Sequence, residues 1–363
     1  MNRNSVRLAA VGLLAIAAQL ILQGLGAVPQ TAAPNLEPID VEGQPLSSNV
    51  ERLIQALELV GTPLPAETRR ALQTAVRARD ARTIQELLDR HVLFVVHLNP
   101  EVRVKVTRGP APAILQQSGF TPFLVKVLNE STSTLPIRIA SPQSGPVYAG
   151  VAKLSMQRER QEHLRENENV NRDNRFLQVE MFSEPPMTRN LSGLKVEYAL
   201  ALIYSSEAGQ REAIIGFDAG QGTQDLGFRG ELPVLFNVRP AVPVRLAIRD
   251  HDGQPTTGRF AFFDRAGHVY PPQVKRLAPD LFFQKQIYRS DGDTVLLPPG
   301  QLTMFYGRGP EYRWLKREIT VPSDGAAQLE VKLERWVHPN AYGYYSGDHH
   351  IHAAGCAHYT SPT

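Results

Sequence analysis

The residues best suited to chemistry lie late in the sequence, where Asp348, His350 and His352 occupy every second position. Five of the ten histidines fall between residues 338 and 358. If residues 344–352 form a strand, side chains alternate between its two faces, so these three groups project to one side. Two imidazoles and a carboxylate at one strand end are the beginning of a divalent-metal site.

Further candidate ligands follow closely. Cys356, the single cysteine of the chain, excludes an internal disulfide and is a metal ligand, a free thiol, an intermolecular partner or a small buried side chain. His358 is either another ligand or a loop residue. His349 points to the opposite strand face and is structural, and His338 is a linker residue beside a proline. The competing interpretation of the whole cluster is an exposed histidine-rich tail that binds metal adventitiously.

The motif Gly347-Asp348-x-His350-x-His352 resembles the opening motif of the PHP (polymerase and histidinol phosphatase) metallohydrolases, in particular their secreted CehA/McbA-like branch. The resemblance implies a distorted β/α barrel whose first strand carries the motif. It implies that His350 and His352 bind zinc or manganese and that Asp348 orients a ligand. A metal-bound water would then attack a phosphoester, amide or carbamate bond.

The resemblance covers only residues 341–363. The remaining ligands of such a barrel come from later strands, and no strand–helix alternation precedes the motif. We therefore expect the truncated start of a hydrolase domain, which is inactive as an enzyme by itself.

Composition predicts an ordinary globular protein with many short strands and turns. The 363 residues are 42% apolar and 21% charged, and they include 28 prolines and 27 glycines. The net charge of +3 gives no indication of a nucleic-acid partner. We expect a mainly β protein with a signal peptide, a small helical unit, two antiparallel β-sandwiches and the first barrel strand.

The N-terminus has the pattern of an export signal. Arg3 and Arg7 precede an apolar run over residues 8–22, and small residues follow. We predict a signal peptide over residues 1–27, with cleavage after Ala27 or Ala33. An uncleaved membrane anchor is the alternative, and either interpretation places the remainder in the periplasm or outside the cell. No further contact with a membrane is expected.

A Pro- and Ala-rich segment, residues 28–46, is predicted to be a disordered tether. Residues 47–91 are predicted to form the small helical unit. Its first helix begins at Ser48 in a sequence typical of a capping box. The next two helices begin near Pro65 and Asp80.

Alternating apolar residues then predict two β-sandwiches, over residues 92–238 and 239–336. The second resembles transthyretin-like, carboxypeptidase-regulatory-like domains in the order of its strands and turns, including Leu297-Pro298-Pro299-Gly300. The resemblance implies a non-catalytic spacer or adhesion unit. Within it, Asp250-His251-Asp252 has the residue types of a metal cluster, but an Asp- and Gly-rich β-turn explains this segment better.

These features support two functions. The first is an exported metal-dependent hydrolase of unknown substrate. The alternative is a secreted, non-catalytic β-sandwich protein that binds or adheres to a partner, with carbohydrate as a candidate. Four aromatic residues could stack on sugar rings, although aromatic residues of sandwiches more often fill the core: Tyr270, Tyr306, Tyr312 and Trp314.

Overall fold

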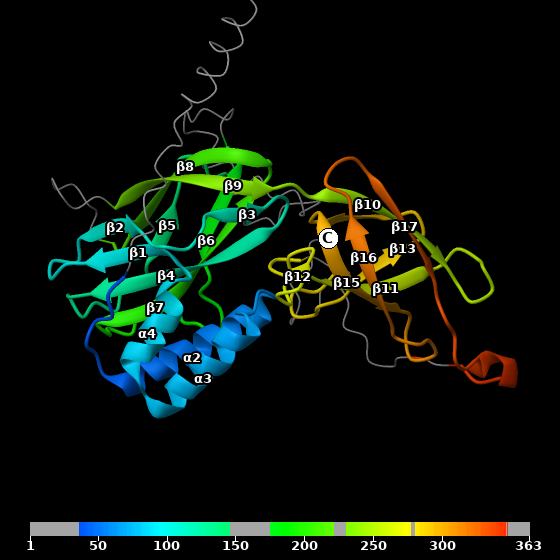
Figure 1. Cartoon of the computed structure of the whole chain (residues 1–363), viewed down its shortest axis with the longest axis horizontal. Coiled ribbons are helices and arrows are strands. Elements are labelled where there is room, and N and C mark those ends of the chain that lie inside the picture. Colours follow the sequence, from blue (N-terminus) through cyan, green and yellow to red (C-terminus); the bar gives the residue numbers. More distant parts are fainter. Residues whose placement is uncertain (1–35, 146–174, 221–229, 277–279, 346, 348–363) are drawn as a thin grey trace, which may run out of the picture. The chain divides into compact units, whose positions relative to one another are not determined.

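The computed structural model describes residues 36–145, 175–220, 230–276, 280–345 and 347. These residues fold mainly as β-structure, as predicted, with three α-helices first and strands in four sheets after them (Figure 1). The predicted signal peptide, residues 1–27, lies outside the described residues. No helix within the described ranges is long and apolar enough to cross a membrane.

The helical unit packs through residues that recur at helical spacing. Its members are α2 (Gly43–Leu59), α3 (Ala66–Ala78) and α4 (Ala81–Asp89). Leu53, Leu72 and Ile84 are completely buried, one from each helix. Asp80 caps α4 as expected, because its carboxylate accepts a hydrogen bond of 3.0 Å from the Thr83 backbone N–H.

The tether predicted over residues 28–46 ends earlier than expected. Its first residues lie outside the described part of the chain, but from residue 36 onward it contacts the helices. The buried Gln85 side chain donates to the Ile39 carbonyl oxygen at 2.7 Å and accepts from its N–H at 3.0 Å. Helix α2 also begins at Gly43, so Ser48 lies inside the helix and is not its cap. Tertiary packing outweighed the local capping signal.

In the first sandwich a five-stranded sheet packs against a four-stranded sheet. The strand order is β2-β1-β4-β7-β6 in the five-stranded sheet and β3-β9-β8-β5 in the four-stranded sheet. Its strands are β1 (Val92–Leu98), β2 (Val104–Arg108), β3 (Ile114–Gln116), β4 (Phe120–Asn129), β5 (Arg138–Ala140), β6 (Leu177–Met181), β7 (Val196–Ser205), β8 (Gly209–Asp218) and β9 (Glu231–Arg239). Strands β1 and β4 run parallel, as do β3 and β9. The sheets are therefore mixed, which corrects the prediction of antiparallel sheets.

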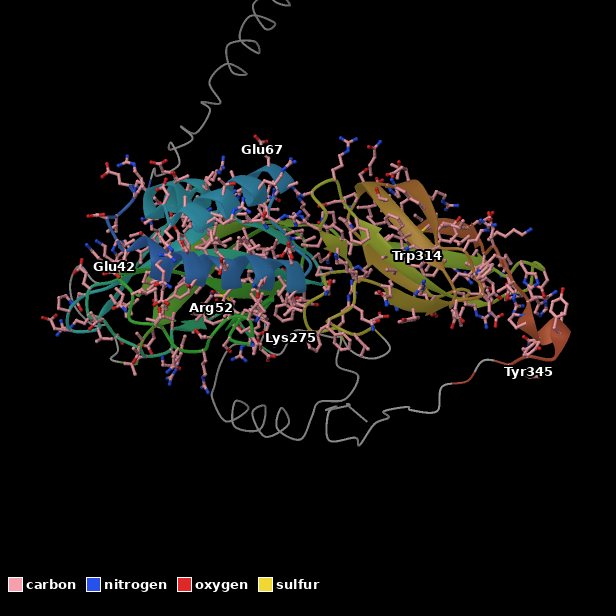
Figure 2. The ribbon with its side chains drawn as sticks, turned by 90° about the horizontal axis from the view of Figure 1, so that it is seen from below. Glu42, Arg52, Glu67, Lys275, Trp314 and Tyr345 are labelled. Atoms are coloured by element: carbon pink, nitrogen blue, oxygen red, sulfur yellow. The ribbon has the colours of Figure 1, made fainter. Side chains whose placement is uncertain are left out.

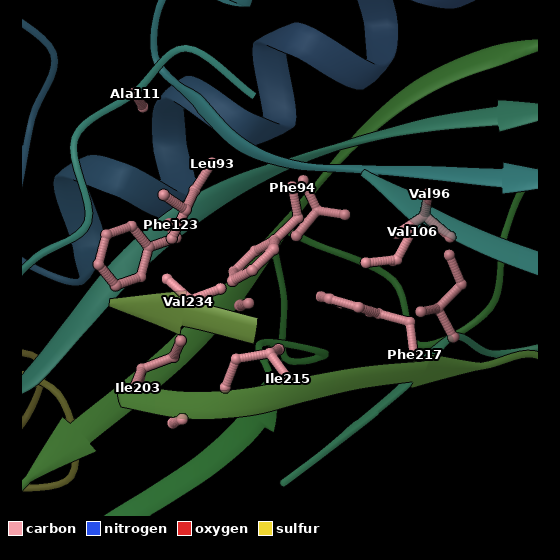
Figure 3. Close-up of a cluster of buried hydrophobic side chains, with 14 of the residues drawn as sticks. Leu93, Phe94, Val96, Val106, Ala111, Phe123, Ile203, Ile215, Phe217 and Val234 are labelled. Carbon is pink, nitrogen blue, oxygen red and sulfur yellow. The ribbon is translucent and has the colours of Figure 1, made fainter. Parts of the chain in front are cut away.

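Both faces of the five-stranded sheet are buried. Phe94 and Val96 of β1 face the four-stranded sheet, where the Phe94 ring lies 5.2 Å from that of Phe217 (Figure 3). Val92 and Val95 of the same strand pack against the helices. This double burial explains why β1 is a nearly continuous apolar run, which is typical of sheets covered on both faces.

A buried ion pair joins the helices to this sheet. The Lys126 ammonium of β4 lies 2.7 Å from the Asp89 carboxylate at the end of α4, and both side chains are nearly inaccessible. The hydroxyl of Tyr198, the cross-strand neighbour of Lys126 on β7, donates to the other Asp89 oxygen at 2.7 Å. Burial raises the pKa of the Asp89 carboxyl, although both hydrogen bonds lower it. The three side chains satisfy one another where water is excluded.

The second sandwich packs a three-stranded sheet, ordered β14-β10-β17, against a sheet ordered β12-β11-β15-β16, with β13 paired to β11. Its strands are β10 (Val242–Arg249), β11 (Thr257–Phe263), β12 (Val269–Tyr270), β13 (Ile287–Ser290), β14 (Thr294–Leu297), β15 (Gly300–Gly307), β16 (Leu315–Val321) and β17 (Ala327–Lys332). Strands β10 and β17 are parallel, so this sandwich is mixed as well. A short 3-10 helix, η2 (Pro339–Tyr342), follows it.

Replacing Lys126 by Met should reduce the free energy of unfolding by about 3–5 kcal/mol, because the Asp89 charge would stay buried without its cation. The double variant Asp89→Leu/Lys126→Met should recover most of this loss, since it buries no charge. Circular-dichroism melting and urea midpoints measure both. The exposed Arg82–Glu86 pair is the control, and Arg82→Met should cost less than about 1 kcal/mol. Equal losses in the single and double variants would contradict the assignment.

Candidate functional site

The predicted metal site falls outside the part of the chain that the structure describes. This holds for all five of its residues: Asp348, His350, His352, Cys356 and His358. The nearest described residues, Tyr344, Tyr345 and Gly347, lie in irregular backbone, so the expected strand does not begin at residue 344. Ligand roles for the five residues stay predictions.

The segment Asp250-His251-Asp252 forms the turn between β10 and β11, as the sequence indicated. A backbone hydrogen bond of 3.0 Å from the Gly253 N–H to the Asp250 carbonyl oxygen closes it. Possible ligand atoms of the three residues lie within 4.8 Å of one another, the one such trio among the described residues. The His251 ring meets that of His338 edge-on, with centroids 5.8 Å apart. His338, expected in a linker, therefore packs against this turn.

The Asp250 carboxylate is already engaged inside the protein. One oxygen accepts from the Arg308 guanidinium at 3.1 Å and from the Tyr312 hydroxyl at 3.0 Å, and the other accepts from the His251 N–H at 2.7 Å. Burial by itself raises the pKa of Asp250, but hydrogen bonds from His251 and Tyr312 outweigh it and lower the pKa overall. Through these contacts the Asp250 carboxylate links its own turn to Arg308 and Tyr312. The interpretation of this segment as a structural β-turn is therefore better supported than a metal site.

The four aromatic residues predicted to form a sugar-binding platform do not lie together. Tyr306 and Tyr312 are each only 9% exposed and belong to the core of the second sandwich. Tyr270 packs against the same core, and its hydroxyl donates to Asp264 at 3.2 Å. Trp314 alone is well exposed, at 43% (labelled in Figure 2). Three of the four predicted platform residues are therefore structural.

Trp314 is accompanied by two rings that the sequence analysis did not select. The Phe305 ring lies 6.3 Å from it at an interplanar angle of 17°, and the Phe263 ring meets Phe305 edge-on at 5.8 Å. Both phenylalanines are half-buried. We call Phe263, Phe305 and Trp314 the aromatic surface. It lies on the face of the β12-β11-β15-β16 sheet that points away from the sandwich core.

Strand alternation produces this surface. Along β15, Met304 and Tyr306 point into the core, so Phe305 points outward, and along β11 Phe263 follows the inward-pointing Phe262. The cross-strand neighbours of Phe305 are Ala261 on β11 and Lys316 on β16. The small Ala261 side chain leaves room for the rings around it. The signal was present in the sequence as the period-two pattern of these two strands.

Polar groups border the aromatic surface. The Thr303 hydroxyl donates to the Glu318 carboxylate at 2.9 Å, and the Lys316 ammonium lies 3.6 Å from the same group. Two residues from Thr303 along β15, the Gln301 side-chain oxygen accepts from the Arg265 guanidinium. The surface thus combines apolar rings with exposed donors and acceptors, which is the composition of a site for an amphipathic ligand.

Comparison with known proteins gives no family. No protein-family model matches the chain, and no curated protein matches it. Solved structures similar to it include the major pilin subunit BcpA of Bacillus cereus (11% identity, 62% of this chain, 68% of that chain, TM-score 0.19). A second is the Bacillus anthracis TIE protein (12% identity, 85% of this chain, 58% of that chain, TM-score 0.19). A third is the Corynebacterium diphtheriae major pilin SpaA (9% identity, 60% of this chain, 64% of that chain, TM-score 0.21). The chain spans less than two thirds of the last two, and similarity at these TM-scores carries no argument about function.

Gly307→Ala should displace the Trp314 ring. A Cβ at residue 307 would lie 2.7 Å from the Arg313 carbonyl oxygen and 3.0 Å from the Trp314 ring, closer than packed atoms allow. In a Trp336→Phe background, which leaves Trp314 as the single tryptophan, emission should shift to longer wavelength and quenching by acrylamide should increase.

The matched control is Gly216→Ala in the first sandwich, where the nearest atom would lie 3.4 Å away. This variant should leave the emission unchanged. If Gly307→Ala also left the emission and its quenching unchanged, the packing of Trp314 described above would be wrong.

Proposed function

We propose that this chain is an exported, non-catalytic β-sandwich binding protein whose aromatic surface holds carbohydrate. Export rests on the predicted signal peptide. The observation that carries the proposal is the exposed Trp314 ring, grouped with Phe305 and Phe263 on an outer sheet face. Large apolar rings are usually buried, as Phe262 of β11 and Tyr306 of β15 are in the core of this sandwich. Rings on the outer face of the same sheet therefore call for a functional explanation.

Carbohydrate matches the mixed chemistry of this surface. A sugar ring presents an apolar face of C–H groups, which can lie against aromatic rings, and a rim of hydroxyls that need hydrogen-bond partners. The aromatic surface offers the rings, and Thr303, Lys316 and Glu318 offer donors and acceptors beside them. Phe263 and Phe305 stand on paired strands, and Trp314 packs against Gly307 and Arg259, so the rings are held in place before a ligand arrives, which limits the entropy lost on binding.

Trp314→Ala should weaken binding of polysaccharide by about tenfold, a typical cost for truncating an aromatic residue that dominates a binding surface. Affinity electrophoresis in gels that contain single polysaccharides measures this loss. Trp336→Ala is the matched control, because Trp336 is 62% exposed, donates its indole N–H to the Pro310 carbonyl oxygen and has no ring contact with Phe263, Phe305 or Trp314 among the described residues. Equal retardation of wild type and Trp314→Ala in every gel would reject the proposal.

A second candidate function is metal-dependent hydrolysis, and the observation in its favour is the motif Gly347-Asp348-x-His350-x-His352. On this proposal the two imidazoles bind zinc or manganese and Asp348 orients one of them. The β-sandwiches would then be accessory domains that hold a polymer near the reaction. Both functions can belong to one protein, since an accessory domain need not be catalytic itself.

Metal content tests the second candidate directly. The double variant His350→Ala/His352→Ala should lose the zinc or manganese that the wild-type chain retains after dialysis, measured by elemental analysis. His251→Ala serves as the control because it removes an imidazole from the Asp250 turn, and it should retain the metal. Metal that survives in the double variant, or that leaves with His251→Ala instead, would contradict the assignment.

A further inference from the structure

We propose that the carbohydrate is acidic and that Arg259, at the edge of the aromatic surface, binds its anionic group. This inference rests on the proposed carbohydrate-binding function and adds to it the chemical class of the ligand. It is carried by three observations: the position of Arg259 between two exposed aromatic residues, its lack of an anionic partner among the described residues, and the basic hollow that it lines.

Arg259 lies in a row of cross-strand neighbours. On one side it is level with Tyr288 of β13, and on the other with Gly307 of β15. Side chains of such neighbours share one sheet face at about 4.5–5.5 Å. Gly307 has no side chain, and the Trp314 ring fills the space above it. In this row Arg259 therefore has an exposed aromatic residue on either side, Tyr288 at 40% and Trp314 at 43% exposure.

The Arg259 guanidinium stacks on an aromatic ring but has no anion. Its central carbon lies 4.3 Å from the centroid of the Trp314 ring. Its Nε is buried and has no hydrogen-bond partner among the described residues. The neighbouring arginines differ, because Arg289 pairs with Asp280 at 2.6 Å and Arg308 pairs with Asp250 at 3.1 Å. Among these three, Arg259 is the one whose charge the described residues leave unmatched.

A hollow of about 320 Å³ opens beside Arg259, within the second sandwich. Its polar lining includes the following residues: Thr257, Arg259, Tyr288, Arg289, Asp293 and Arg308. Three arginines and one aspartate line the hollow; Arg289 and Arg308 are paired with Asp280 and Asp250, so Arg259 supplies the unmatched positive charge. An oxygen of the Asp293 carboxylate accepts from the Ser290 N–H at 2.7 Å. The volume lies within the range of small-ligand sites and suits about one sugar ring with its substituent.

The surrounding charge favours an anionic ligand. Residues 239–336 contain 15 Lys and Arg against 11 Asp and Glu, a net charge of +4, although the whole chain has only +3. A carboxylate or sulfate on a sugar ring could take two parallel hydrogen bonds from the planar Arg259 fork while the ring lies against Trp314 or Tyr288. A neutral sugar would use the rings and leave the guanidinium without a partner. The surface is therefore best matched by a polysaccharide of uronic acids or sulfated sugars.

The test compares polymers that share a sugar backbone and differ in whether it carries anionic groups. Polygalacturonate and its fully methyl-esterified form share one backbone, and dextran sulfate and dextran form the corresponding sulfate pair. Wild-type chain should bind the acidic member of at least one pair about tenfold more tightly than the neutral member, by affinity electrophoresis or titration calorimetry. The pair for which the two affinities differ shows whether the site prefers a carboxylate or a sulfate group.

Arg259→Gln should abolish this preference, so that the variant binds the acidic and the neutral member of each pair with similar affinity. Arg245→Gln is the matched control, because it removes one charge from an exposed position on β10, in the opposite sheet, and it should keep the preference. Arg259→Lys retains the positive charge but loses the planar guanidinium that can donate two parallel hydrogen bonds. This variant should keep less than half of the wild-type difference in binding free energy between the acidic and the neutral polymer. Melting curves that superimpose show that each variant is folded.

The two proposals fail in different ways. Neutral-polymer binding that does not depend on Trp314 would overturn the proposed function. An acidic preference that persists in Arg259→Gln, or no preference in the wild type, would overturn the present inference and leave that function intact. Polyglutamate bound as tightly as polygalacturonate would also overturn it, because the site would then recognise charge without a sugar ring.

Discussion

The structure depends on one constraint of β-strands, namely that each strand presents side chains on two faces and each face needs its own environment. In the first sandwich both faces of the five-stranded sheet are covered, by the second sheet and by the helices. Apolar side chains satisfy this constraint almost everywhere. Lys126 and Glu197 are buried charged exceptions: Lys126 pairs with Asp89 of α4, which also accepts from Tyr198 of β7, and Glu197 accepts from Ser192. Burial on both faces thus explains the apolar runs, and each of these two charged side chains has a partner that offsets its burial.

The second sandwich meets the constraint differently. Phe260, Phe262 and Met304 fill its core, while Phe263 and Phe305 lie on the opposite face of the same strands, with Trp314, just before β16, beside Phe305. Phe263 and Phe305 are half-buried there, and Trp314 is 43% exposed. Rings that stay accessible on a rigid sheet have a small entropic cost on binding, so a surface of this kind is suited to recognition. Arg259 gives it a charge that the described residues do not match.

The sequence predicted what depends on local pattern. Period-two runs located β10 and β15, and Asp80 marked the start of α4. Parallel pairing of β1 with β4 was missed because strand partners are chosen over long distances in the chain. Trp314 was selected together with Tyr306, which lies in the core, because the register that assigns each ring to a face is a property of the whole sheet. The metal motif is purely a sequence prediction, since its residues lie outside the described part of the chain.

The most direct test of the account is to map the ligand onto the protein. Nuclear magnetic resonance shifts of ¹⁵N-labelled chain would be followed while an oligogalacturonate is added. We expect the Arg259 Nε–H and Trp314 indole N–H signals to move first and to saturate together, with the backbone amides of β15 near Phe305. Shifts confined to the first sandwich, or an unchanged spectrum in a large excess of acidic and neutral sugars, would contradict the claim that this surface binds carbohydrate.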